Sequence, residues 1–187
     1  MRLEAVKSVV RGLLAVFGTS TTTEPRPGSG RRPSGSGGPA ASDVSSTTSP
    51  GRSGPEATIE VASTVLRRAS IVFEPRVDGE PDPGEVIWTW VPYEENDGRG
   101  KDRPVVIVAR DTARSVFAVQ LTSTPHDDDA RHFVYIGPGA WDSQGRPSWA
   151  RLDRVFRVFE SGMRREANSV SREQFAAVST ALASRLS

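Results

Sequence analysis

The chain has 187 residues, and its 24 basic and 23 acidic side chains give a formal net charge of +1. A nearly neutral chain has no global attraction to nucleic acid, so any basic surface must come from local arrangement. Cysteine is absent, which excludes disulfides, thiolate metal sites and cysteine nucleophiles, and two histidines are too few for a histidine-based metal site, so we expect neither a metal nor a cofactor.

The first 18 residues have the pattern of an amphipathic helix. Apolar residues recur at the spacing of one helical face, at Leu3, Val6, Val10, Leu13, Leu14 and Phe17. Arg11 interrupts the apolar stretch, which argues against a secretory signal, and the internal charges exclude a membrane span. Two roles stay open: a helix that fluctuates or packs weakly on the domain, and one that docks on a partner or a membrane surface. We expect a cytoplasmic protein.

Residues 19–56 predict a disordered linker. Glycine, proline, serine and threonine fill 28 of these 38 positions, and Val44 is the one large aliphatic residue. Such a segment cannot bury enough apolar surface to offset its chain entropy. The third part of the chain is then a folded domain over 57–187, with its core at 82–186.

Order is expected to resume near Ala57. Residues 59–68 have mixed apolar spacing that favours a short helix ending at Arg67 and Arg68, where positive charge suits a helix C-terminus. A strand over part of this stretch stays open. Three prolines between 75 and 83 then impose an extended, irregular approach to the first clear strand.

Five segments beyond residue 84 have the composition and alternation of β-strands. They are 85–91, 103–109, 115–122, 132–136 and 149–159. The continuous apolar run at 103–109 indicates a central strand that is buried on both faces, and 115–122 is expected to form a hairpin with it.

The C-terminal segment predicts a helix. Ser171 followed by Gln174 is a capping box, and Phe175, Val178 and Leu182 supply an apolar stripe at helical spacing. Several short strands with one late helix indicate an α+β fold in which a small curled β-barrel is closed by a helix.

Arg103 is the first candidate for chemistry. It lies between a loop containing two glycines and Pro104, which restricts Arg103 to extended geometry. A guanidinium so placed can bind a phosphate through two parallel donors and stabilise charge on a pentavalent phosphorus. The alternative is a surface arginine paired with a nearby carboxylate, such as Asp102, Glu94 or Glu95.

Thr122 and Ser123 end a neighbouring strand, where a hydroxyl can hydrogen-bond a phosphate oxygen or a ribose 2′-hydroxyl. The alternative is that they only cap backbone groups. His126 is a candidate helper in proton transfer, although a plain loop histidine fits its position better. The acidic triplet at 127–129 is interpreted as solvated, and we assign it no metal.

Five arginines follow between positions 151 and 165. They could face an RNA backbone or pair across strands with the acidic loop at 94–97, and the sequence favours neither alternative. The four tryptophans could stack on bases but fit a core or dimer interface better.

The order of these motifs over residues 82–186 resembles the MazF/PemK family of toxins, particularly the actinobacterial type. The family's opening motif appears as 84–88 (Gly-Glu-Val-Ile-Trp), its Arg-Pro strand as 103–108, its strand-ending Thr-Ser as 121–123, and its later Leu-x-Asp-x-Val-like strand as 152–155. Each motif is weak alone, but the order and spacing are specific.

The resemblance implies an SH3-like barrel that forms a homodimer and cleaves single-stranded RNA (mRNA) without a metal. It implies attack of the ribose 2′-hydroxyl on the adjacent phosphate, with Arg103 and Thr122 as catalytic residues. The expected substrate-binding residues are Lys101, Ser123, Arg99 and Arg154. It also implies a cognate antitoxin that occupies the RNA groove.

Two alternatives to a ribonuclease stay open. One is a non-enzymatic DNA gyrase poison of the CcdB type on the same architecture, although the C-terminus lacks the tryptophan-containing tail of that family. The other is a degenerate member that only binds a partner. The loop at 93–102 and residues 127–129 depart from the family pattern. Their acidic side chains would repel an approaching RNA backbone.

Overall fold

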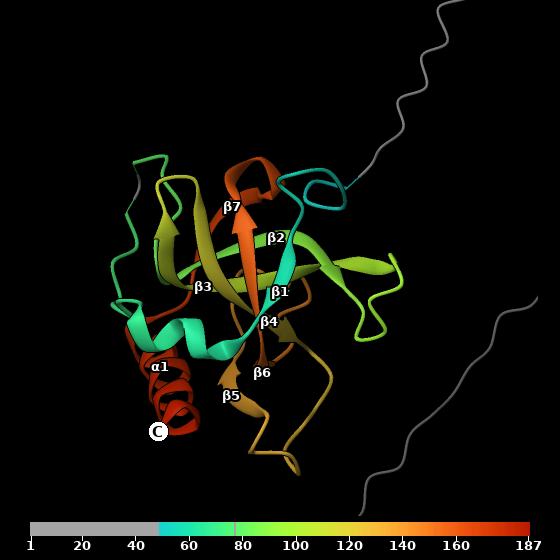
Figure 1. Cartoon of the computed structure of the whole chain (residues 1–187). Coiled ribbons are helices and arrows are strands. Elements are labelled where there is room, and N and C mark those ends of the chain that lie inside the picture. The colour runs from blue at the N-terminus through green and yellow to red at the C-terminus, as the bar shows by residue number, and fades with distance from the viewer. Residues whose placement is uncertain (1–48, 77) are drawn as a thin grey trace, which may run out of the picture. The chain divides into compact units, whose positions relative to one another are not determined.

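The computed structural model describes residues 49–76 and 78–187, so the predicted helix over 1–18 and most of the predicted linker lie outside the described residues. Figure 1 shows a curled sheet with α1 packed at one side. The strands are β1 (Ile59–Val61), β2 (Glu85–Pro92), β3 (Gly100–Thr112), β4 (Ser115–Thr122), β5 (Phe133–Gly137), β6 (Ser148–Phe159) and β7 (Arg164–Ser169). The helices are the 3-10 turns η1 (Ser63–Arg68) and η2 (Glu160–Gly162) and the α-helix α1 (Arg172–Leu186). None of the described helices is long and apolar enough to cross a membrane.

The seven strands form one antiparallel sheet in the order β1-β6-β4-β3-β2-β7, with β5 also paired to β6. The prediction of a closed barrel is wrong, because among the described residues β7 pairs with β2 alone and β1 and β5 pair with β6 alone. The physical reason lies in the two end strands. β7 consists mostly of exposed polar and charged residues, and β1 has only three residues, so neither offers a long apolar strand that would drive further pairing.

All five predicted strands are present, within a few residues of their expected ends. Two further strands escaped prediction. The stretch 59–68 divides into β1 and the 3-10 turn η1, so the helix and the strand that the sequence left open both occur. β7 has the sequence Arg-Arg-Glu-Ala-Asn-Ser, which shows no apolar alternation, and its backbone pairs with β2 while Arg164 and Arg165 form ion pairs with Asp102 and Glu85.

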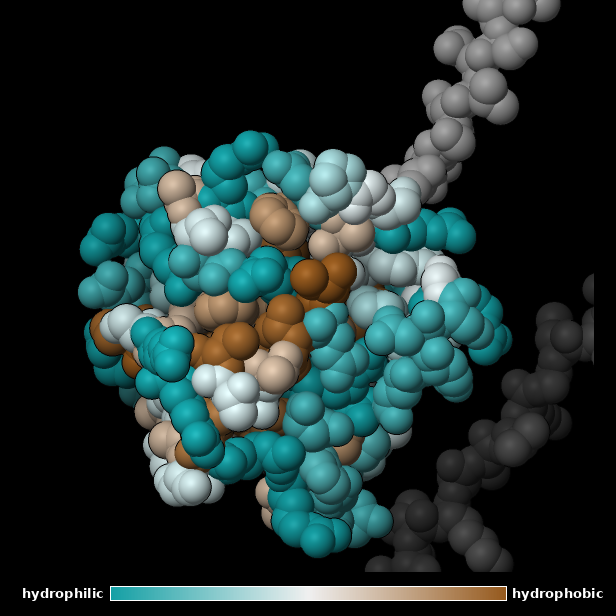
Figure 2. All heavy atoms as spheres, viewed as in Figure 1, coloured by the Kyte–Doolittle hydropathy of each residue, from teal (hydrophilic) through white to brown (hydrophobic). Residues whose placement is uncertain are grey.

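The sheet is buried on both faces, and each face has its own apolar cluster. One cluster includes Val106 and joins the strands to η1 and, through Phe175, to α1. The other cluster lies on the opposite face and includes Val105 and Phe156. Neighbouring residues of β3 thus belong to different clusters, which confirms the predicted two-sided central strand. Figure 2 shows apolar residues gathered near the centre of one face, around β1 and η1, within a hydrophilic surround.

The capping box at the start of α1 is confirmed. The Ser171 hydroxyl accepts a hydrogen bond from the backbone N–H of Gln174, and the Gln174 side chain accepts one from the backbone N–H of Ser171. Gln174 also donates to the carbonyl oxygens of Ile136 and Pro138. The cap therefore fixes the helix start and ties it to the end of β5.

Residues 49–56 correct the predicted end of the linker. The carbonyl of Pro50 accepts a hydrogen bond from the Trp90 backbone, and Gly51 accepts one from Thr58. Glu56 pairs with Arg114 at 2.8 Å across the domain. Their glycine, proline and serine content predicts disorder, but in the structure the β2 edge and the end of β6 supply hydrogen-bond partners for this turn.

Gly51 tests whether this turn belongs to the folded domain. Its φ is +78°, and a Cβ built there would lie 2.6 Å from the Thr58 hydroxyl oxygen. We expect Gly51→Ala to lower the free energy of unfolding by about 1–3 kcal/mol, because it adds a steric clash to backbone strain. Gly54→Ala is the matched control, since Gly54 has φ +92° with nothing within 4 Å. Equal effects of the two substitutions in denaturant unfolding would contradict the packed turn.

Candidate active site

The ladder between β3 and β4 places the predicted catalytic residues. Val105 on β3 pairs with Gln120 on β4. This is the last pair of the ladder at that end, and Arg103 and Thr122 lie two residues beyond it, each on its own strand. On its other side Arg103 pairs with Thr89 of β2, so the backbone of Arg103 is held within the sheet.

Arg103 and Thr122 line the same cleft, which has a volume of about 320 Å³ and is called the Thr122 cleft below. Two of the predicted substrate-binding residues, Lys101 and Ser123, line it as well. Within the described residues Arg103 forms no ion pair, so the carboxylate pairing that the sequence left open does not occur. The Thr122 hydroxyl accepts a hydrogen bond from the Thr124 backbone at 3.1 Å, which orients it at the strand end.

A second polar hollow of about 360 Å³, called the Gln120 hollow below, is also lined by Arg103. Its other lining residues are Val91, Pro92, Tyr93, Glu94, Glu95, Gln120, Arg151 and Arg154. The Gln120 side chain is 8% exposed, and its amide forms no hydrogen bond within the described part of the chain. Sequence reasoning missed this residue, although a single polar side chain inside the apolar run of β4, two positions before Thr122, is a signal that could have found it.

The other two predicted substrate-binding residues have partners within the domain. Arg99 lies in the exposed loop before β3 and pairs with Asp97 at 2.6 Å, and the hydrogen bonds and charge of Asp97 raise the pKa of the arginine. Arg154 is buried, and it donates two hydrogen bonds to Glu60, at 2.8 and 2.6 Å, and one to the carbonyl of Pro92. Neither guanidinium is left open toward the Thr122 cleft.

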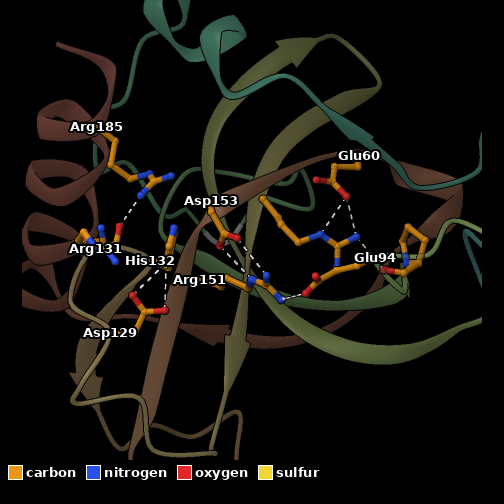
Figure 3. A network of polar contacts seen from close by, with 10 residues as sticks. Glu60, Glu94, Asp129, Arg131, His132, Arg151, Asp153 and Arg185 are labelled. Carbon is orange, nitrogen blue, oxygen red and sulfur yellow. Dashed lines mark hydrogen bonds and ion pairs between the residues drawn. The ribbon is translucent and has the colours of Figure 1, made fainter.

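All five arginines between 151 and 165 pair with carboxylates. Arg151 binds Glu94 at 2.7 Å and Asp153 at 2.8 Å, and Figure 3 shows it between these two carboxylates. The remaining pairs are Arg154 with Glu60, Arg157 with Asp111, Arg164 with Asp102 and Glu166, and Arg165 with Glu85. The pairing with the 94–97 loop that the sequence left open holds for Arg151 alone, through Glu94, and the other four arginines pair with carboxylates outside that loop.

The loop that faces the Thr122 cleft from the other side has its own internal pair. Asp142 binds Arg146 at 2.9 Å, and both residues line the cleft. Burial raises the pKa of Asp142, but the backbone hydrogen bond from Gln144 and the contacts with Arg146 lower it by more, so the pKa lies below its ordinary value. Lys101 and Arg103 are therefore the cationic side chains of the cleft that no described carboxylate pairs.

Two buried polar atoms in the wall of the Thr122 cleft lack a hydrogen-bond partner. They are the Nε1 of Trp88 and the Oδ1 of Asp102. The Oδ2 of Asp102 lies 3.3 Å from Arg164, whose guanidinium stacks over the Trp88 ring at 5.3 Å. Because β3 alternates, Asp102 and Arg103 point to opposite faces, so this cluster supports the strand behind Arg103.

The histidines and the acidic triplet belong to one loop. His126 stacks on Phe133 with ring centroids 3.7 Å apart, which fits the loop histidine favoured by the sequence. His132 contacts Asp129 at 2.9 Å, and Asp127 accepts a hydrogen bond from Trp149. No group of three histidine, aspartate or glutamate side chains that could hold a metal ion occurs in the described ranges.

Comparison with known proteins gives the following matches. Residues 82–186, more than half of the chain, match PemK-like, MazF-like toxins of type II toxin-antitoxin systems. The curated proteins contain no significant match.

Solved structures similar to this chain include an endoribonuclease in complex with its cognate antitoxin from a Mycobacterial species, at 23% identity and TM-score 0.44, covering 57% of this chain and 95% of that chain. Another is MazE-MazF (Form-II) from Deinococcus radiodurans, at 16% identity and TM-score 0.44, covering 58% and 97%. A third is the toxin MazF-mt6 of Mycobacterium tuberculosis, at 18% identity and TM-score 0.39, covering 54% and 93%.

The Arg151–Asp153 pair gives a pH-dependent prediction. Burial raises the pKa of Asp153, but the hydrogen bonds and charge of Arg151 lower it by more, so the folded value lies below the ordinary 3.8. The stabilisation is therefore present above pH 3.8 and is lost as pH falls through the folded pKa. We expect Asp153→Asn to cost on the order of 1–3 kcal/mol at neutral pH, with the difference from wild type shrinking below pH 3.8.

Chemical unfolding of both proteins between neutral pH and pH 3 measures this difference. Asp128→Asn is the control, because the exposed Asp128 forms no ion pair among the described residues. A difference between Asp153→Asn and wild type that stays constant with pH would contradict the assignment.

Proposed function

The chain belongs to the PemK-like, MazF-like toxins of type II toxin-antitoxin systems, as the order of its motifs predicts, and we propose that it is a metal-independent endoribonuclease of single-stranded RNA. The observation that supports this proposal is that Arg103, unpaired within the described residues, lines one cleft with Thr122. A guanidinium and a hydroxyl from adjacent strands form a pair of donors suited to one phosphate. Lys101 and Ser123, in the same cleft, would bind the neighbouring backbone.

The proposed reaction is an internal phosphoryl transfer. The ribose 2′-oxygen attacks the adjacent phosphorus and loses its proton, the bond from phosphorus to the 5′-oxygen breaks, and that oxygen takes up a proton. The products are a 2′,3′-cyclic phosphate and a 5′-hydroxyl end. Arg103 would stabilise the negative charge of the pentavalent phosphorus, and Thr122 would orient a phosphate oxygen or the attacking hydroxyl.

The proposed partner is a cognate antitoxin. An acidic peptide segment would compete with RNA, because its carboxylates can accept the same hydrogen bonds from Arg103 and Lys101 that a phosphate accepts. The homodimer and the cytoplasmic location stay predictions from the sequence and the resemblance. So does contact of the residue 1–18 segment with a membrane, for which the described residues offer no observation.

Replacement of Arg103 tests the proposed activity. We expect Arg103→Ala to lower the rate of RNA cleavage by about 100-fold or more, the usual effect of removing one preorganised transition-state donor. The assay is incubation of purified protein with a mixed single-stranded RNA in the presence of a chelator. Arg68→Ala is the control, since Arg68 is exposed on η1 and lines neither the cleft nor the Gln120 hollow. A loss below about tenfold would place the catalytic centre elsewhere.

Thr122→Val separates the hydroxyl from the shape of the side chain. The valine keeps the β-branched volume, and we expect the cleavage rate to fall by about 10- to 100-fold with folding unchanged, because one hydrogen bond to a charged group is lost. Thr180→Val, which alters an exposed hydroxyl on α1 outside the cleft and the Gln120 hollow, is the control. Thermal unfolding and single-turnover cleavage of the two variants decide the comparison, and equal rates for both would exclude the Thr122 hydroxyl.

The same preparation discriminates the two alternative functions. DNA breaks that require gyrase, without RNA cleavage, would support a poison of the CcdB type. Binding of an antitoxin without either activity would support a degenerate family member. The position of Arg103 at one cleft with the strand-end hydroxyl of Thr122 favours the ribonuclease, because one phosphate can accept hydrogen bonds from both groups.

A further inference from the structure

Gln120 has a position that the phosphate chemistry of the site leaves unexplained. Gln120 lies between Val119 and Leu121 in β4 and is 8% exposed, and it lines the Gln120 hollow. Within the described part of the chain its amide forms no hydrogen bond, and its polar atoms are not sealed from the hollow. A polar amide between two apolar neighbours therefore offers its donors and its acceptor to whatever fills the hollow.

The geometry points to a nucleobase as that group: we propose that the Gln120 hollow binds the base next to the scissile phosphate and selects bases that have an exocyclic amino group. This inference rests on the proposed function and extends it to the sequence preference of the RNA. Gln120 supplies the hydrogen bonds to the base edge, and the carboxylate of Glu95 supplies the selection.

The position of Arg103 connects the hollow to the reaction. Arg103 lines both the hollow and the Thr122 cleft. Val105 pairs with Gln120, and Arg103 lies two residues before Val105 on β3, so Gln120 is the diagonal neighbour of Arg103. Diagonal neighbours on one face of a sheet lie about 7–8 Å apart. A phosphate held by Arg103 therefore leaves an adjacent base within reach of the Gln120 amide.

The charges of the hollow exclude a second phosphate as its occupant. Arg151 is neutralised by Glu94 and Asp153, and Arg154 is neutralised by Glu60. Glu95 adds a carboxylate at the rim and forms no ion pair within the described ranges. A dianionic or monoanionic group would meet net negative charge there, whereas a neutral base would not.

The combination of an amide and a carboxylate selects among bases. The glutamine amide offers one acceptor and two donors, which can pair with the edge of adenine, cytosine, guanine or uracil. A carboxylate only accepts hydrogen bonds, so it favours the amino groups of adenine, cytosine and guanine and repels the carbonyl oxygens of uracil. We therefore expect discrimination against uracil at this position.

Binding measured without cleavage tests the inference separately from the activity. Short 2′-deoxy homo-oligonucleotides of adenine, cytosine or uracil lack the attacking hydroxyl, and fluorescence anisotropy gives their affinity for the full chain. We expect wild type to bind the adenine and cytosine oligonucleotides about tenfold more tightly than the uracil one, the ordinary discrimination of one good base contact. Gln120→Leu, which keeps the side-chain volume, should reduce that ratio to about threefold or less.

A second variant protects the test against misfolding. Glu95→Gln lies in an exposed loop and should raise the affinity for uracil, narrowing the same ratio without affecting thermal unfolding. Asp128→Asn is the matched control, since it removes an exposed carboxylate outside the hollow and should leave the ratio unchanged.

The outcomes are distinguishable from those of the ribonuclease proposal. A base preference that disappears in Gln120→Leu or Glu95→Gln supports the hollow even if ribose oligonucleotides are not cleaved, which would overturn the activity alone. Cleavage of RNA by a wild-type protein that shows no preference overturns the hollow alone. A preference that survives in both variants also overturns it, as does absence of any binding, whereas the ribonuclease proposal depends on the cleavage assay with ribose oligonucleotides.

Discussion

The antiparallel ladder between β3 and β4 determines where the polar groups of the candidate site lie. Both strands are buried on both faces, so a slip of one residue would move every side chain of either strand into the wrong cluster. The register that pairs Val105 with Gln120 is therefore fixed by packing rather than by the site itself. Its bulges, between Ile107 and Ala109 and between Arg110 and Thr112, lie toward the hairpin and away from Arg103. The apolar core thus positions Arg103, Gln120 and Thr122 without any contact among them.

The carboxylate pairs of the later arginines limit where the proposed RNA substrate could be attracted to a chain of net charge +1. If the five arginines of β6 and β7 were unpaired, RNA would bind wherever they lie, and no single phosphate would be preferred. Each of the five instead has a carboxylate partner. The unpaired cations of the Thr122 cleft are Lys101 and Arg103, which concentrates the attraction at one place. Local neutralisation, rather than total charge, is what defines the site.

The parts of the fold that the sequence predicts are those set by near neighbours. The capping box at Ser171, the apolar run of β3 and the hairpin that follows it depend on residues a few positions apart, and all are present. Residues 49–56 and β7 were missed because partners distant in sequence hold them in place: Trp90 binds the turn at Pro50, and β2 binds β7. The sequence did not predict the carboxylate partner of each arginine for the same reason, since Arg154 and Glu60 are 94 positions apart.

For the site, the motif order predicts Arg103 and Thr122 from local features, a proline after one and a strand end at the other, and both line one cleft, while their catalytic role stays a proposal. Nothing local distinguishes Arg154, which is buried against Glu60, from Arg103, which is unpaired within the described residues, since both are arginines in β-strands. Gln120 shows the converse. The sequence shows that Gln120 is a single polar residue in an apolar run. The hollow that Gln120 lines also includes Tyr93, Glu94 and Glu95, and the sequence does not show that these residues lie beside it.

From the sequence, the carboxylates of the loop at 93–102 are expected to repel an RNA backbone. Their positions in the structure give them a different consequence. With two unpaired cations the Thr122 cleft can neutralise about two phosphates, so counterion release supplies a small part of the affinity and a shallow dependence on salt. The remaining affinity must come from the bases, through hydrogen bonds and stacking. Carboxylates at the rim of the Gln120 hollow would repel the RNA only weakly if its phosphates lay on the other side of Arg103. They would also accept hydrogen bonds from the amino groups of a base. Under the proposed function, sequence selection would then be needed for binding at all, and the proposed antitoxin would abolish it by covering Lys101 and Arg103, the two cations of the cleft that no described carboxylate pairs.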